Sequence, residues 1–239
     1  YGHPRTQGDY SSLLSAYGAV YGEEPVKYEP YATINWQNAL PTTDLLRKPI
    51  ISMSETEFAK FVRAVGNLDW IRIGHEKYMH GDRCPFCQGT LDKEKFERDL
   101  TSCYDEQYRK DQDNLQRFSN VYREALNRIH AILKANQSNP YPVEEFQAQG
   151  YQYEFDMFME KAHANVVLLE QKLKEPSLEI FDFVDLAPYL HKISDVIAGI
   201  NRSIKAYMDL VNDPKKKQKV SREIWSFMAY ECRGLLEDY

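Results

Sequence analysis

The stretch that decides the fold is DKEKFERDLTSCYDEQYRKDQDNLQRFSNVYREALNRIHAILKA, residues 92–135. Apolar and aromatic side chains recur in it at gaps of three, four or seven residues, with charged residues between them. These side chains are Phe96, Leu100, Tyr104, Tyr108, Leu115, Phe118, Tyr122, Leu126, Ile129 and Leu133. This spacing places them on one face of an α-helix, close to the pattern of a coiled-coil seam. The stretch therefore predicts one long helix over about residues 92–135.

Two further segments, residues 153–174 and 190–211, carry apolar residues at the same helical period. NQSNPYP, residues 136–142, separates the first two helices, because proline removes a backbone donor and disfavours helix in the residue before it. Pro214 follows a second break and suits the first turn of a last helix. LEIFDFV, residues 178–184, is the best strand candidate but is short. We therefore expect an all-α fold of long antiparallel helices.

The domain organisation follows from the position of these signals. Residues 1–50 are rich in Tyr, Gly and Pro and predict an irregular, linker-like segment, with a short helix over SSLLSAYGAV, residues 11–20. Ser54 and Glu57 have the spacing of a capping box, which predicts the start of the first core helix. Residues 51–239 then form a helical bundle or coiled-coil-like domain.

Composition narrows the class of protein. Lys and Arg number 30 and Asp and Glu 36, for a formal net charge of -6, which disfavours nucleic-acid binding by charge alone. No window approaches about 18 uninterrupted apolar residues, so no membrane span is expected. Four cysteines do not form a secreted disulfide framework, and we expect a reducing, cytoplasmic setting. Because the chain begins at Tyr1 rather than at methionine, we expect a segment of a longer protein.

HGDRCPFCQGTLD, residues 80–92, carries the most specific chemical signal of the chain. Cys84 and Cys87 form a Cys-x-x-Cys turn that Pro85 stiffens, so that two thiolates can converge on one zinc ion. Zinc in a structural site has four ligands in a tetrahedron, and this turn supplies two of them. The pattern indicates a tentative zinc site whose remaining ligands come from elsewhere.

Three sources for the remaining ligands stay open. His75 and His80 have a spacing that allows a local site, Cys103 is a third candidate, and a second chain can contribute the same cysteine pair. The alternative is a turn with reduced thiols and two exposed histidines. Cys103 and Cys232 lie among apolar residues, so we expect both to be small core residues.

A resemblance to a known family rests on residues 68–92 and 96–118. They resemble a block of the bacterial SMC-like or ABC-type AAA ATPases, the family that includes the anticodon nucleases PrrC and RloC. The W-x3-G pattern of that block is matched by Trp70 and Gly74, and its Cys-Pro-x-Cys turn by residues 84–87. The later run NDPKKKQKVSREIWSFMAYE is similar to the return segment of the family.

The resemblance implies a helical insertion, or arm, between the two halves of a nucleotide-binding head. It implies self-association or contact with that head, and a partner in a phage-defence system. In related long-armed ATPases the cysteine turns of two protomers share one zinc. One residue departs from the pattern, since the family usually carries glycine where this chain has Gln88.

ATP chemistry is expected outside this chain. The sequence contains no G-x-x-x-x-G-K-[ST] loop, whose amides and lysine hold phosphates, and no LSGGE-like signature. We therefore expect the chain itself to lack catalytic residues and to serve a longer ATPase.

Two alternatives stay open. Arg123 and His130 lie seven residues apart on one helix, a spacing that recurs in a helical RNase superfamily. KKKQK, residues 215–219, offers Lys side chains to a phosphate backbone, which fits a stand-alone helical adaptor that binds nucleic acid or a protein partner. The structural interpretations of the same residues are a solvated arginine with a helix-flanking histidine, and a solvated lysine loop near a helix start.

Overall fold

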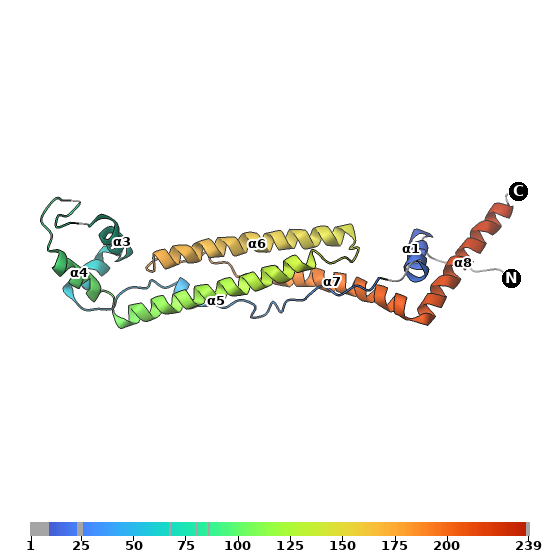
Figure 1. Cartoon of the computed structure of the whole chain (residues 1–239), viewed down its shortest axis with the longest axis horizontal. Helices are drawn as coiled ribbons and strands as arrows, with labels where there is room; N and C mark the ends of the chain where they lie inside the picture. The colour runs from blue at the N-terminus through green and yellow to red at the C-terminus, as the bar shows by residue number, and fades with distance from the viewer. Residues whose placement is uncertain (1–9, 23–25, 67, 80, 86, 238–239) are drawn as a thin grey trace. The chain divides into compact units, whose positions relative to one another are not determined.

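The computed structural model describes residues 10–22, 26–66, 68–79, 81–85 and 87–237. Within these residues the chain forms eight α-helices, one short 3-10 helix and no strand, which confirms the all-α prediction (Figure 1). The elements are α1 (Tyr10–Tyr21), η1 (Asp44–Leu46), α2 (Glu57–Val65), α3 (Leu68–Tyr78), α4 (Lys93–Ser102), α5 (Glu106–Asn136), α6 (Glu145–Lys174), α7 (Ala187–Asn212) and α8 (Pro214–Glu237).

The chain divides into two compact units, and each is described by itself. The first unit comprises Tyr1–Thr33, Lys134–Tyr151 and Ser194–Tyr239. The second comprises Ile34–Leu133 and Gln152–Ile193. Helices α5, α6 and α7 each contribute residues to both units.

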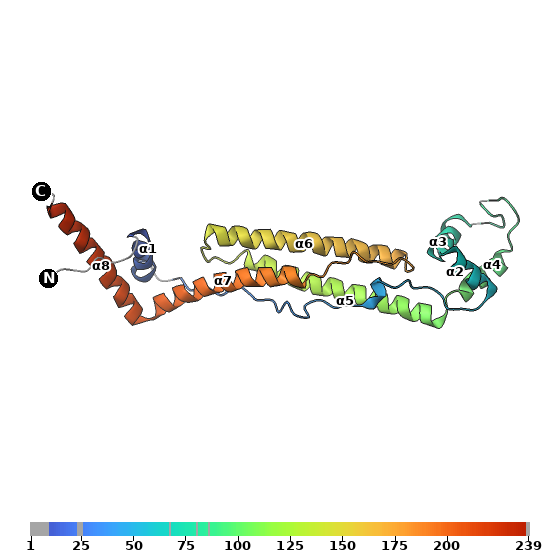
Figure 2. The ribbon, with the colours of Figure 1, turned by 180° about the vertical axis from the view of Figure 1, so that it is seen from behind.

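The core of the second unit lies between long helices. The portions of α5 and α6 in this unit lie side by side and run in opposite directions (Figure 1, Figure 2). Their buried apolar side chains are those that the helical spacing predicts. From α5 and α6 they include Leu115, Phe118, Tyr122, Leu126, Ile129, Leu133, Phe158, Ala162 and Leu169. Burying each large apolar side chain contributes about 1.5–3 kcal/mol, so this stripe stabilises the unit.

The prediction of one continuous helix over residues 92–135 is wrong, because α4 ends at Ser102 and α5 begins at Glu106. Asp105 lies at the break and organises it. Its carboxylate accepts the backbone N–H of Tyr108 at 2.8 Å and the backbone N–H of Met53 at 2.6 Å. Burial raises the pKa of Asp105, but these hydrogen bonds and others outweigh it and leave the pKa below its usual value.

Other boundary predictions have mixed outcomes. The capping box at Ser54 is wrong, because the N-cap of α2 lies two residues later at Thr56, whose hydroxyl accepts the N–H of Ala59 at 3.2 Å. The short helix in the N-terminal segment and the start of the last helix at Pro214 are confirmed by α1 and α8. Residues 178–184 form no strand.

In the first unit, an extended segment is held by asparagine side chains. Asn136, at the end of α5, donates to the carbonyl of Ala32 at 2.9 Å and accepts the N–H of Ala32 at 2.8 Å. Asn201 of α7 makes the same pair of bonds to Tyr31, at 3.0 and 2.7 Å. The amide of each asparagine thus satisfies both backbone groups of one residue that lies outside any helix. Helix α1 packs against α8 in the same unit.

The second unit repeats this arrangement at Asn165 of α6. Its side chain is fully buried, accepts the N–H of Val184 at 2.8 Å and donates to the carbonyl of Val184 at 2.8 Å. It also lies 2.8 Å from the hydroxyl oxygen of Tyr122, to which it donates. Asn165 therefore fixes the segment before α7 to the long helices.

A buried lysine joins three parts of the second unit. The ammonium group of Lys172 on α6 donates to the carbonyl of Lys48 at 2.7 Å and to the carbonyl of Leu178. Its side chain is fully buried. Burial lowers the pKa of Lys172 to about 8, and the charges of Asp69 and Glu179 oppose this shift.

The first prediction concerns Asn165. Asn165→Ala removes a fully buried amide and its bonds to the part-buried backbone groups of Val184, so we expect the free energy of unfolding to fall by about 1–3 kcal/mol. Urea denaturation followed by circular dichroism measures it. Asn127→Ala, at an exposed position of α5, is the control and should change stability by less than about 0.5 kcal/mol. Equal effects of the two substitutions would contradict the role given to Asn165.

The second prediction concerns pH. Between about pH 8 and pH 10 the unfolded chain keeps the Lys172 proton that the folded chain has lost, so the free energy of unfolding should rise by on the order of 1–3 kcal/mol. Above this window, buried tyrosines such as Tyr122, whose pKa burial raises to about 12, reverse the trend. Urea denaturation at pH 8, 9 and 10 checks it. Lys172→Met should abolish the rise, whereas Lys174→Met, at an exposed position, should retain it.

Candidate functional site at the cysteine turn

The described part of the cysteine turn, residues 82–85 and 87–91, forms a closed hairpin that contains both cysteines. The N–H of Leu91 donates to the carbonyl of Asp82 at 2.7 Å, and the N–H of Cys84 donates to the carbonyl of Gly89 at 2.9 Å. One isolated antiparallel bridge lies between these two bonds. The described part of the turn is therefore a defined backbone structure and not an open loop.

Gln88 has the left-handed backbone conformation, with φ of 60°. Glycine is the residue that adopts this conformation at least cost, and other residues need local compensation. Here the N–H of Gln88 donates to the carbonyl of Cys84 at 2.9 Å, and its side-chain amide donates to the carbonyl of Pro85 at 3.2 Å. These two hydrogen bonds support the left-handed conformation at a residue that is not glycine.

The two thiols of the turn are accessible. Cys84 is half-buried and Cys87 is exposed. A methyl group added at Gly89 would lie 3.4 Å from the sulfur of Cys87, so the backbone of residue 89 passes close to this sulfur. Two accessible sulfurs on one hairpin fit the requirements of half a tetrahedral zinc site.

The described residues do not complete such a site. They contain no group of three or more His, Cys, Asp and Glu side chains that could hold a metal. His80, one of the predicted ligands, lies outside the described residues. In the described part of the chain, the turn therefore contributes Cys84 and Cys87 as a pair.

His75, the other predicted histidine ligand, has partners between α3 and α4. Its ring lies against Phe96, with ring centroids 5.6 Å apart, and its Nε2 lies 3.6 Å from a carboxylate oxygen of Glu97. Nε2 is buried and makes no hydrogen bond. The structure thus groups His75 with α4 and with no set of metal ligands among the described residues.

The other two cysteines differ from each other. Cys103 is fully buried, as expected for a core residue, and burial raises the pKa of its thiol. Cys232 is exposed, so the prediction of a buried residue is wrong. The buried apolar residues of the described part of α8 are Val220 and Ile224, and Cys232 lies eight residues beyond the second of them.

Arg123 and His130, the pair considered for RNA cleavage, both have structural partners on α6. Arg123 donates to a carboxylate oxygen of Glu170 at 3.1 Å, and the ring of His130 stacks on Phe155 with centroids 6.0 Å apart. These contacts join α5 to α6 and support the structural reading of the pair.

The lysine run at residues 215–219 occupies the first turns of α8. Lys216 lies 3.8 Å from a carboxylate oxygen of Asp209, and Lys219 lies 3.6 Å from one of Glu223. All of these side chains are substantially exposed, so the pairs contribute little to stability. The run is a solvated helix start with part of its charge balanced locally.

Comparison with known proteins gives a match to one family. A family model described as an AAA domain matches residues 7–239. The chain belongs to the AAA domain family. This family of AAA-type ATPases is SMC-like, so the coarser part of the resemblance is confirmed. Neither a search of curated proteins nor a search of solved structures returned a match to this chain. No helix in its described residues is long and apolar enough to cross a membrane.

The third prediction tests the strain at Gln88. Gln88→Val places a β-branched residue in the left-handed region, which costs about 1–2 kcal/mol, so the hairpin should open more often. We expect the amide hydrogen of Leu91 to exchange about tenfold faster, measured by NMR. Gln88→Gly should exchange as slowly as the unmodified chain. Thr90→Val, at an extended position, is the matched control, and equal rates in both valine variants would contradict the strain.

Proposed function

We propose that this chain is the helical arm of an SMC-like AAA ATPase and that ATP is bound and hydrolysed in another part of the protein. One observation carries the proposal: the chain belongs to the AAA domain family, yet its described residues are helical and its sequence has no phosphate-binding loop. A family member with this combination suits a mechanical or contact role better than catalysis.

The long helices suit the transmission of a conformational change. Helix α5 has 31 residues and α6 has 30, so each is about 45 Å long at 1.5 Å per residue. Packed side chains along α5 and α6 resist bending, because a close-packed core transmits displacement rather than absorbing it. On this proposal, an ATP-driven change in the head is transmitted along the packed portions of α5 and α6 in the second unit.

The cysteine turn is the proposed contact point between two copies. Each copy offers Cys84 and Cys87 on a closed hairpin, and two such pairs complete a tetrahedral zinc site. Zinc would supply a cross-link that needs no large interface. His75 packs against Phe96 of α4, and the described residues include no metal-binding group that contains it, so we favour ligands from a second chain over a site built on this histidine.

The helices before the turn support a contact role. Phe61 of α2 and Tyr78 of α3 are each 59% exposed, and Trp70 of α3 is 55% exposed. Exposed large apolar side chains mark an interaction surface where they form one contiguous patch. On this proposal they lie next to the second copy or to a partner protein of the anticodon-nuclease or phage-defence type.

The fourth prediction tests the contact. We expect about one zinc per two chains by elemental analysis and a dimer by light scattering, because each chain supplies two of four ligands. Cys84→Ser should lose the zinc and leave a monomer. Cys232→Ser, which removes an exposed thiol elsewhere, is the matched control and should keep both.

Two results would overturn this contact. A monomer with one zinc per chain would place all ligands within one chain. A chain without zinc, whose mass does not change in Cys84→Ser, would remove the cysteine turn from the proposal.

A further inference from the structure

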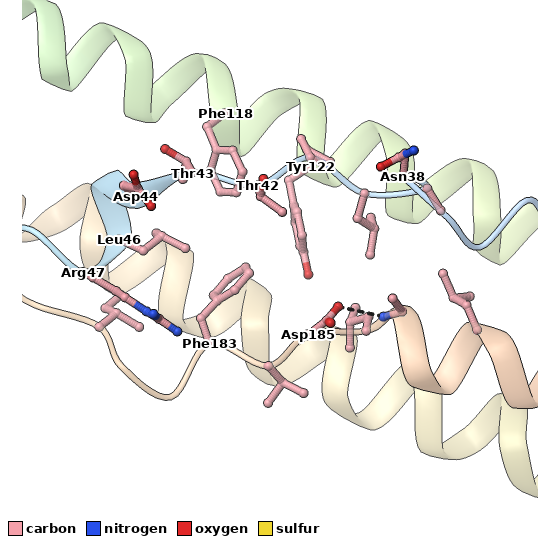
Figure 3. A pocket seen from close by; sticks show the side chains of 18 of the residues that line it. Asn38, Thr42, Thr43, Asp44, Leu46, Arg47, Phe118, Tyr122, Phe183 and Asp185 are labelled. Carbon is pink, nitrogen blue, oxygen red and sulfur yellow. Dashed lines mark hydrogen bonds between the residues drawn. The ribbon is translucent and has the colours of Figure 1, made fainter.

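A cavity of about 430 Å³ lies in the second unit, where residues 36–47, α5 and residues 180–190 meet (Figure 3). Ligand pockets have volumes of about 300–1,000 Å³ and apolar walls with a few polar groups. Four aromatic side chains line this cavity: Trp36, Phe118, Tyr122 and Phe183. Its size and walls are therefore those of a small-molecule site.

The aromatic rings are set at angles around the space. The rings of Phe118 and Tyr122 have centroids 5.7 Å apart, and those of Tyr122 and Phe183 are 5.3 Å apart with 59° between their planes. Figure 3 shows Phe118 and Tyr122 reaching from α5 toward Phe183 on the opposite side. These rings pack against one another along the cavity wall. Because the face of an aromatic ring is negative, the ring surface that borders the cavity favours a cation.

The charged side chains at the cavity also favour a cation. Asp44 and Asp185 contribute two carboxylates and Arg47 one guanidinium, which leaves one net negative charge. Asp185 lies close to the hydroxyl end of Tyr122 in Figure 3, and one of its oxygens accepts the N–H of Ala187 at 2.9 Å. The second oxygen of this carboxylate can meet a ligand at the cavity.

Tyr122 stays neutral in this setting. Burial raises its pKa to about 12, with the charge of Asp185 acting in the same direction, while a hydrogen bond from Asn165 opposes the shift. Its hydroxyl oxygen accepts that bond at 2.8 Å, which fixes the ring. The phenol therefore carries no charge, and the negative charge at the cavity comes from the carboxylates.

We propose that this cavity binds a small organic cation with alkylated ammonium chemistry, taken up as a free small molecule. The alkyl groups contact the rings of Phe118, Tyr122 and Phe183, and the carboxylate of Asp185 balances the charge. Arg47 is the opposing charge and limits the affinity. The site uses none of the residues of the cysteine turn, so its test is independent of the arm function.

The fifth prediction compares choline with 3,3-dimethylbutan-1-ol, its neutral isostere, by calorimetric titration of the whole chain. We expect choline to bind at least about tenfold more tightly, because the two differ in charge and hardly in shape. Equal affinities, or no choline binding at tens of millimolar, would overturn the proposal. This comparison uses the unmodified chain, so its outcome does not depend on whether a substituted chain folds.

Substitutions assign the site to the cavity. Asp185→Asn keeps an acceptor for Ala187 but removes the charge, so choline affinity should fall about five- to tenfold. Asp182→Asn, at an exposed position of the same segment outside the cavity, is the matched control and should have no effect. Arg47→Gln should raise the affinity several-fold. Choline binding that is unchanged in Asp185→Asn would place the ligand elsewhere and overturn the assignment.

Discussion

The structure depends on one constraint: backbone that lies against helices without forming helix or sheet must still have its N–H and C=O groups satisfied. Asparagine meets this constraint, because its side-chain amide has one donor and one acceptor edge that match one residue of extended backbone. Asn136 and Asn201 do so in the first unit, and Asn165 does so in the second. Without them, the backbone groups of Tyr31, Ala32 and Val184 would lose these partners.

The helices could be predicted from sequence because their period reflects which face is buried. Residues 190–211, for example, lie entirely within α7, and Ile193, Ile197 and Ile200 are fully buried. The break before α5 could not be predicted, because the partners of Asp105 include Met53, about fifty residues earlier. The N-cap of α2 was misplaced because Ser54 and Thr56 both carry the required hydroxyl.

The candidate sites also differ in how far they could be predicted from the sequence. Cys84 and Cys87 are neighbours in sequence, so their pairing could be predicted, whereas the contacts of His75 depend on how α4 packs on α3. The cavity could not be predicted at all, since Trp36, Tyr122 and Asp185 come from three separate segments. Its only local signal is an aspartate two residues before the first residue of a helix, which is common at helix starts.

The asparagine contacts also have an evolutionary consequence. At Ala32 and Val184 the asparagine amides bind main-chain atoms, so these contacts place no demand on the identity of residues 32 and 184. The side chain of Ala32 is exposed and that of Val184 is half-buried. Selection at Asn136 and Asn165 should therefore be strict, while positions 32 and 184 are free to drift, and related chains can keep the same path with little sequence identity along it.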